Sequence, residues 1–197
     1  MGLSPKAVRS FLEEFGELRE NGCYNKKTGR KIAACMPMHT FGFPVHLDEL
    51  IKVCKDWNIL LVEDAAESLG SEYKGKQTGG FGEVGVFSFN GNKIVTSGGG
   101  GAIVTNNFKF GERAKFLTTT AKEPHSFEYI HNELGYNYRM PNVNAALACA
   151  QLEQLSGFLE SKRNLAKEYQ DFFKEKGMNF RTETNNTKAN YWLMCVE

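Results

Sequence analysis

The spacing of apolar residues in the first third of the chain predicts two helices alternating with two strands. A serine–proline pair at 4–5 is typical of a helix start, because serine caps the N-terminus and proline suits the first helical position. Apolar residues then recur at helical spacing over 8–18 and again over 47–57. Apolar runs at 31–37 and 59–64 have the length of buried strands. The strand–helix–strand order is that of a βαβ unit, which implies a parallel sheet covered by helices.

The middle of the chain is expected to add two strands and a helix to this sheet. The strand candidates are the apolar runs at 84–89 and 101–106, and a helix follows near 107–117. Nearer the N-terminus, the polar segment at 21–30 is expected to form a turn between the first helix and the first strand.

A long helical pattern dominates the last third of the chain. It opens at Pro141 and continues to about Lys176, with an expected break or kink near 156–157. The segments at 180–184 and 190–197 then look like strands of a second, smaller domain.

Together these elements predict an α/β protein: a three-layer α/β/α domain with a mostly parallel sheet, followed by the start of a small α+β domain. The expected boundaries are 1–145 for the first domain, and 146–197 for a long linking helix with part of the second. Four strands are few for a parallel sheet, so the chain is expected to be a fragment of a longer protein.

Composition and charge exclude several classes of protein. The 24 basic and 23 acidic side chains nearly cancel and are dispersed, so neither a nucleic acid nor a membrane is expected as a partner. Five cysteines without a C-x-x-C pair argue against a disulfide framework and a zinc site. No apolar stretch reaches the ~20 residues of a membrane-spanning helix. No secretory signal is recognisable, and a cytoplasmic location is expected.

Two glycine-containing segments fail the tests for phosphate-binding motifs. Gly80, Gly82 and Gly85 have the spacing of a dinucleotide fingerprint, but they lead into a strand, whereas that motif opens a helix. A flexible turn is therefore favoured. In the run "FNGNKI", Asn92 and Ile94 stand where a P-loop needs glycine and serine or threonine.

Asp64 ends the strand predicted at 59–64, at the edge where open α/β sheets bind ligands. The structural interpretation is that Asp64 caps a helix, with Glu67 as the capping-box glutamate three residues later. The functional interpretation is that the carboxylate faces a cation, either a metal or a protonated ring nitrogen. No cluster of histidines or carboxylates accompanies Asp64, so no metal site is expected.

Lys93 lies between the aromatic-rich run at 84–89 and the four glycines at 98–101. A lysine amine that is desolvated and close to other cations is the usual nucleophile of Schiff-base chemistry. The glycines would let the backbone pass close to a bound group. Ser88, five residues before the lysine, offers a hydroxyl to a phosphate. The alternative, a surface lysine at a hairpin, stays open on these residues alone.

Four motifs in order resemble a known family, the DegT/DnrJ/StrS sugar-nucleotide aminotransferases. They are "EDAAESLG", "GGFGEVGVFSFNGNK", the glycine run after the lysine, and "LGYNYRMPNVNAALACAQL". The resemblance is clearest over 31–155 and implies a pyridoxal 5'-phosphate (PLP) enzyme of fold type I. It looks closest to the branch acting on 4-keto sugar nucleotides, such as the enzymes of perosamine and legionaminic acid pathways.

The resemblance implies a role for each matching residue. Lys93 would bond covalently to PLP and move the proton between substrate and cofactor. Asp64 would pair with the pyridinium nitrogen, Glu67 would lie beside the ring hydroxyl, and Ser88 would bind the cofactor phosphate. Asn137, in "GYNYRM", would reach the PLP phosphate of the neighbouring subunit, which makes the protein a homodimer. For Arg139, a substrate contact and a structural role remain open, and no role is assigned to His131.

The implied reaction converts a nucleotide-linked 4-keto-6-deoxy sugar to the amino sugar, with glutamate as donor, in surface polysaccharide biosynthesis. Related sugar dehydratases carry histidine at the lysine position, so Lys93 favours transamination. Residues 1–145 would then be the C-terminal part of the PLP-binding domain. A family member also has a front segment with a phosphate loop and an aromatic residue that stacks on PLP, and no such segment is recognisable in this sequence. The alternative is therefore a non-catalytic PLP-binding regulator or an inactive remnant.

Overall fold

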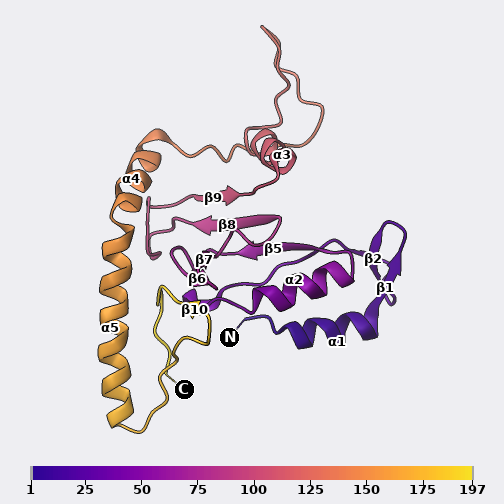
Figure 1. Ribbon diagram of the computed structural model, residues 1–197. Coiled ribbons are helices and arrows are strands. Elements are labelled where there is room, and N and C mark those ends of the chain that lie inside the picture. Colours follow the sequence, from indigo (N-terminus) through magenta and orange to yellow (C-terminus); the bar gives the residue numbers. More distant parts are fainter. Residues whose placement is uncertain (1, 197) are drawn as a thin grey trace.

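The centre of the molecule is a four-stranded sheet, seen in a computed structural model that describes residues 2–196 (Figure 1). The strand order is β4-β5-β8-β9. The first three strands are parallel, and β9 joins the edge antiparallel to β8. The strands are β4 (Ala34–Cys35), β5 (Leu60–Asp64), β8 (Val84–Ser88) and β9 (Gly101–Val104). The predicted α/β class with a mostly parallel sheet is confirmed.

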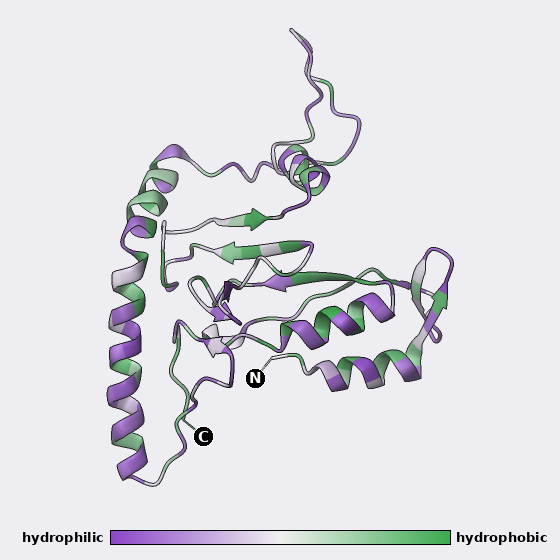
Figure 2. Cartoon of the chain, in the orientation of Figure 1, coloured by the Kyte–Doolittle hydropathy of each residue, from purple (hydrophilic) through white to green (hydrophobic). Residues whose placement is uncertain are grey.

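Two amphipathic helices, α1 (Pro5–Phe15) and α2 (Leu47–Asp56), pack together and supply the main core. Figure 2 shows apolar and polar residues alternating along both helices. Leu12, Leu47 and Leu50 are almost fully buried in this core, where they meet Leu61 of β5. Burying side chains of this size contributes roughly 1.5–3 kcal/mol each. The predicted βαβ unit is therefore present, with α2 between β4 and β5.

The segment expected to be a turn at 21–30 instead contains a strand. A small antiparallel sheet is formed there by β1 (Gly16–Arg19), β2 (Gly22–Asn25) and β3 (Lys31–Ile32). Gly22 has a φ of 128°, which permits the tight reversal between β1 and β2. Cys23 is fully buried in the main core, and this burial explains why a polar-looking segment is ordered as a strand. The run at 31–37 is accordingly divided between β3 and β4.

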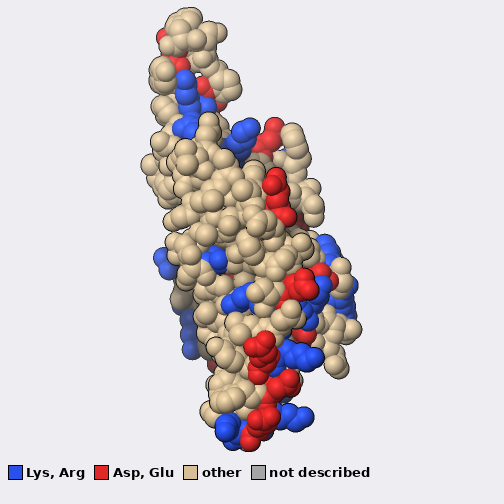
Figure 3. All heavy atoms as spheres, turned by 90° about the vertical axis from the view of Figure 1, so that its left-hand side faces the viewer, with Lys and Arg blue, Asp and Glu red and all other residues tan. Residues whose placement is uncertain are grey.

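Three further helices follow β9: α3 (Phe108–Thr118), α4 (Asn142–Glu153) and α5 (Leu155–Glu175). The expected long helix is thus interrupted, but at Gln154 rather than at 156–157. Glu153 is the only charged residue of α4, whereas α5 carries both signs throughout. Figure 3 views the molecule from the side on which α4 and α5 lie, and it shows red and blue side chains gathered over the α5 end.

The strands predicted at 180–184 and 190–197 are not formed by the described residues. A short strand occurs between them, β10 (Thr187–Lys188), which pairs with β6 (Glu72–Tyr73). With β7 (Lys76–Gln77) they make a three-stranded sheet. In the described part of the two predicted segments, a single bridge between Phe180 and Val196 joins them. Within residues 2–196, no helix is long and apolar enough to cross a membrane.

Candidate active site around Lys93

Strand register places Asp64 and Ser88 on one face of the sheet. Asp64 pairs with Val86, two residues before Ser88 on β8. Side chains alternate along a strand, so Asp64, Val86 and Ser88 point to the same side, whereas Glu63 points to the other. Both polar residues are the last of their strands and are partly exposed. The carboxyl ends of β5 and β8 therefore bring a carboxylate and a hydroxyl to one surface.

Asp64 does not cap a helix, because the residues after it form turns. Its Oδ1 accepts the N–H of Ala66 at 3.1 Å, which is an Asx turn. Glu67 is not a capping-box residue either: its Oε2 accepts the N–H of Phe41 at 2.7 Å. Phe41 lies in the short 3-10 helix η1 (Thr40–Gly42) with a φ of 59°. The carboxylate of Glu67 thus holds a left-handed residue in place.

Lys93 is not a free surface lysine. Its Nζ lies 3.8 Å from Oε1 of Glu67, and the two side chains are only 13% and 14% exposed. The same ammonium lies 4.0 Å from the centre of the Trp192 ring, a cation–π contact. The carboxylate and the indole therefore confine the amine from two directions. Lys93 does lie in the connection between the antiparallel strands β8 and β9, as the hairpin interpretation holds, but its side chain is not an exposed surface group.

Trp192 and Asn190 complete this arrangement from the far end of the chain. Trp192 Nε1 donates to the carbonyl of Asn92 at 2.7 Å, beside the lysine. The fully buried Asn190 donates through Nδ2 to the carbonyls of Glu67 and Leu69, both at 2.9 Å. Its Oδ1 accepts the Trp192 N–H at 2.8 Å. The sequence interpretation missed both residues, because their segment has the apolar pattern of a strand.

The glycines after Lys93 serve the backbone. Gly98 and Gly100 have φ values of 80° and 88°, which side-chain-bearing residues rarely adopt. A Cβ on Gly101 would lie 2.4 Å from the carbonyl of Phe87, so β9 can approach β8 only with glycine there. A cavity of about 780 Å³ opens beside this run, lined also by Arg139, but none of the five predicted site residues lines it.

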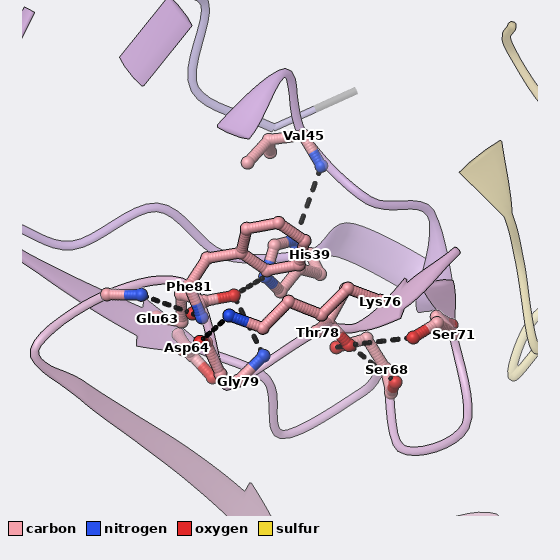
Figure 4. Close-up of polar contacts among 12 residues, drawn as sticks. His39, Val45, Glu63, Asp64, Ser68, Ser71, Lys76, Thr78, Gly79 and Phe81 are labelled. Carbon is pink, nitrogen blue, oxygen red and sulfur yellow. Dashed lines mark hydrogen bonds and ion pairs between the residues drawn. The ribbon is translucent and has the colours of Figure 1, made fainter. Parts of the chain in front are cut away.

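A buried carboxylate on the opposite face of the sheet was also missed. Glu63, which is fully buried, accepts the backbone N–H groups of Gly79, Phe81 and Gly82 at 2.6–2.8 Å (Figure 4). His39 Nε2 lies 3.1 Å from the same carboxylate, and His39 Nδ1 accepts the N–H of Val45. The imidazole is therefore neutral, with its proton on Nε2. The glycine-rich segment is a turn as predicted, but one anchored by Glu63.

The environment of Glu63 sets its charge. Burial raises the pKa of this carboxyl group, whereas the hydrogen bonds from His39 and the three backbone amides lower it. The hydrogen bonds prevail, so the pKa of Glu63 lies below its ordinary value and the group is ionised.

Asn137 and Arg139 lie between α3 and α4 and have no hydrogen bond or ion pair with the other four predicted residues in the described chain. Asn137 bridges to Thr119, and its Oδ1 accepts from Arg139 at 3.3 Å. Arg139 also donates to the carbonyl of Thr119 at 3.0 Å. His131 Nδ1 lies 2.8 Å from the carbonyl of Thr120. The structure thus brings Glu67 and Lys93 into contact and places Asp64 and Ser88 on one face, but it leaves Asn137 apart.

Comparison of the sequence with known protein families identifies the family to which the chain belongs. Residues 23–197 match the DegT/DnrJ/EryC1/StrS aminotransferase family. The chain belongs to this family.

Similar DegT-family proteins are known from curated sequences and solved structures. EpsN of Bacillus subtilis (strain 168), whose name describes a PLP-dependent aminotransferase, is 38% identical over 98% of this chain and 47% of EpsN. GDP-perosamine synthase of Escherichia coli O157:H7 is 37% identical over 87% of this chain and 46% of that protein. DesV of S. venezuelae superposes with a TM-score of 0.82 at 26% identity, over 99% of this chain and 48% of that chain. The chain therefore spans about half the length of these relatives.

The resemblance stated from the four motifs is confirmed, and DegT-family aminotransferases are PLP-dependent. The residues present fit that cofactor. Lys93 is an amine shielded from solvent, and Asp64 and Ser88 end two parallel strands on one face. An amine, a carboxylate and a hydroxyl are the groups that a pyridine aldehyde phosphate requires.

Proposed function

We propose that the protein is a PLP-dependent aminotransferase that converts a nucleotide-linked 4-keto-6-deoxy sugar to the amino sugar. The proposed amino donor is glutamate, and the proposed context is the biosynthesis of surface glycans. The observation that carries the proposal is the confinement of the Lys93 amine between Glu67 and Trp192. GDP-perosamine synthase of E. coli O157:H7 and a UDP-4-amino-4,6-dideoxy-N-acetyl-beta-L-altrosamine transaminase of Campylobacter jejuni, 36% identical, support this substrate class.

The positions of these side chains support the proposed roles. Bound PLP supplies an electron-accepting ring. Lys93 provides the amine that bonds to the cofactor and then carries a proton at Nζ. Asp64, at the end of β5, keeps a proton on the ring nitrogen by pairing with it, and Ser88 donates a hydrogen bond to the phosphate. Glu67 is proposed to lie beside the ring hydroxyl.

Glu67 has a second proposed role in holding Lys93 before the cofactor arrives. One carboxylate oxygen is fixed by the Phe41 N–H, and the other faces the ammonium. A carboxylate at this distance stabilises the charged amine and limits its rotamers. The side chain therefore keeps Nζ aimed at one place, which is the requirement for a covalent attachment at a defined atom.

Asn137 is proposed to act on the PLP phosphate of the neighbouring subunit in a homodimer. Support comes from the absence of a hydrogen bond or ion pair between Asn137 and the other four residues within 2–196, and from exposed aromatic side chains on the same segment between α3 and α4. Phe127, Tyr129 and Tyr138 are each at least 70% exposed, which is unusual for rings of this size. The division into 1–145 and 146–197, and a cytoplasmic location, stay predictions.

The proposed action of Asn137 on the neighbouring subunit is tested by mixing two inactive variants, Lys93→Ala and Asn137→Ala, and allowing the subunits to exchange. A site shared between subunits restores activity to about a quarter of the wild-type value, because half of the dimers then hold one intact site. If Asn137 acts within its own subunit, the mixture stays inactive.

The central proposal is tested by adding PLP to the purified protein and recording the absorbance band of the bound cofactor. Wild-type protein is expected to hold PLP that borohydride fixes to Lys93, whereas Lys93→Ala holds none covalently. Lys109→Ala, on the exposed surface of α3, is the matched control. Attachment of PLP to the Lys93→Ala protein would disprove the assignment. Attachment to wild type without turnover of glutamate and a keto-sugar nucleotide would favour the non-catalytic PLP-binding alternative.

A further inference from the structure

A second, smaller cavity lies directly beside Lys93. Its volume is about 270 Å³, and it lies between the loop after β8 and the first half of α5. Lys93 and Trp192 form one side, and Lys162 of α5 forms another. Asn92 and Ser161 also line it and are exposed, so the cavity is open to solvent.

The charges around this cavity are all of one sign. Among residues 2–196, the two ionisable groups that line it are lysines, and no carboxylate does. Lys93 has Glu67 as its partner, whereas Lys162 forms no ion pair with any residue in 2–196. Lys162 Nζ instead donates a hydrogen bond to the carbonyl of Trp192, at 3.0 Å.

The half-buried position of Lys162 makes the missing counter-charge costly. Burial lowers the pKa of Lys162, since the ammonium loses water without gaining an anion. The next residue on the helix shows the contrasting case: Arg163 lies 2.6 Å from Glu183 and also donates to the carbonyl of Ala189. Helix α5 therefore offers a paired cation for packing and, next to it, an unpaired cation facing a cavity.

We infer that this cavity is a subsite for an oxyanion group of a substrate, bound by Lys162 beside the reacting amine of Lys93. The inference rests on the proposed function, because it takes Lys93 as the site of reaction. Lys162 supplies the charge, Ser161 and Asn92 supply neutral hydrogen-bond donors, and the Trp192 ring forms an apolar wall. A carboxylate or a phosphate fits a volume of about 270 Å³, whereas a complete nucleotide sugar needs more space.

Two substrates of the proposed reaction carry such a group. The amino donor has carboxylates, and the nucleotide sugar has a diphosphate. One cationic subsite next to Lys93 serves whichever substrate places its oxyanion there while its reacting carbon is near Nζ. The two sources are distinguished by probes that contain only the anion.

The test titrates the PLP-loaded protein with inorganic pyrophosphate and, separately, with glutarate, and measures binding by calorimetry. The variants are Lys162→Met, which removes the charge, and Lys162→Arg, which keeps it. Lys167→Met is the control, since Lys167 is exposed on the same helix and does not line the cavity. Loss of a charge-assisted hydrogen bond is expected to weaken binding of one probe roughly tenfold to a hundredfold in Lys162→Met. Lys162→Arg and Lys167→Met are expected to stay near wild type.

Each outcome decides the inference. A specific loss of pyrophosphate binding assigns the subsite to the nucleotide sugar, and a specific loss of glutarate binding assigns it to the donor. Equal binding of both probes by Lys162→Met and wild type overturns the subsite, and so does the absence of binding to wild type. A drop in melting temperature without any change in binding shows that Lys162 only fastens the carbonyl of Trp192.

The same variants separate this inference from the proposed function. Uptake of PLP is recorded by absorbance before each titration, and the titrations are repeated without cofactor. If PLP does not attach to Lys93, the proposed function fails, although a Lys162-dependent anion site would still be measured. If PLP attaches normally and Lys162→Met binds both probes as wild type does, the subsite alone fails.

Discussion

The side-chain amide of Asn190 donates to the backbone carbonyl of Glu67 at 2.9 Å, and this bond joins two segments separated by more than half of the chain. Asn190 is fully buried, and its amide group makes two further hydrogen bonds, with the carbonyl of Leu69 and the N–H of Trp192. A Cβ on Gly42 would collide with its Oδ1, so the pocket around the amide is tightly filled.

Replacement of Asn190 by alanine is therefore expected to destabilise the protein strongly. The change leaves two carbonyls and one N–H without partners in a buried site, which costs about 2–4 kcal/mol. Chemical denaturation followed by fluorescence measures the loss. Asn185→Ala, at an exposed turn, is the control and is expected to change stability little. Equal stability of Asn190→Ala and wild type would contradict the role given to this amide.

Trp192 is expected to control how readily Lys93 attaches to PLP. Trp192→Phe keeps a ring under the ammonium but loses the bond to the Asn92 carbonyl, whereas Trp192→Leu loses both. Since a cation–π contact contributes about 0.5–2 kcal/mol, the affinity for PLP should fall further in Trp192→Leu than in Trp192→Phe. Borohydride trapping and mass spectrometry of the Lys93 peptide measure it. An identical affinity in the two variants would show that the ring face has no part in holding the amine.

Asp64→Asn is expected to separate catalysis from folding. Asparagine can still accept the N–H of Ala66, so the Asx turn remains and the melting temperature should be unchanged. The amide cannot hold a proton on the ring nitrogen by charge, and the turnover rate should fall by about a hundredfold or more. Steady-state kinetics beside thermal melting check the two halves of this expectation. A variant as active as wild type would remove Asp64 from the proposed site.

Glu63 is expected to make stability depend on pH in the acid range. Its pKa is lower in the folded protein than the usual 4.5, so ionised Glu63 stabilises the fold above about pH 4.5. This stabilisation is lost as the pH falls through the depressed folded-state pKa. Glu63→Gln should lower stability at pH 7 by roughly 3 kcal/mol, because an amide cannot accept from four donors. Its unfolding free energy should also vary less with pH between about 5 and 3 than that of wild type. Parallel pH profiles would contradict this assignment.

The sequence predicted the parts of the site that are local. Asp64 ends one apolar run that is recognisable as a strand, Ser88 is next to last in another, and parallel strands place their carboxyl ends at one edge. The proposed role of Lys93 comes from its neighbours in the sequence and from the order of the four motifs. The surroundings of that lysine depend on contacts across about 100 residues, from Asn92 to Trp192, and no spacing rule encodes them.

The errors have physical causes of the same kind. Asp64 and Glu67 have the spacing of a helix cap, but Glu67 instead bonds to the Phe41 N–H, and the chain turns. The segment after Lys188 has the apolar pattern of a strand. Asn190 and Trp192 nevertheless form their hydrogen bonds with loop residues and not with a neighbouring strand. Tertiary hydrogen bonds thus overrode local preference at the positions that surround the lysine.

The late position of Trp192 in the chain has a consequence for biosynthesis. The ribosome releases Lys93 about 100 residues before it releases the indole that confines the lysine amine. We therefore expect a nascent chain to complete the central sheet before it can retain PLP. Binding of the cofactor should begin only once residues 190–192 have been synthesised and have folded against Lys93. A chain stopped at residue 185 should leave Lys93 open to acylating reagents, and protection equal to that of the longer chain would refute this order of events.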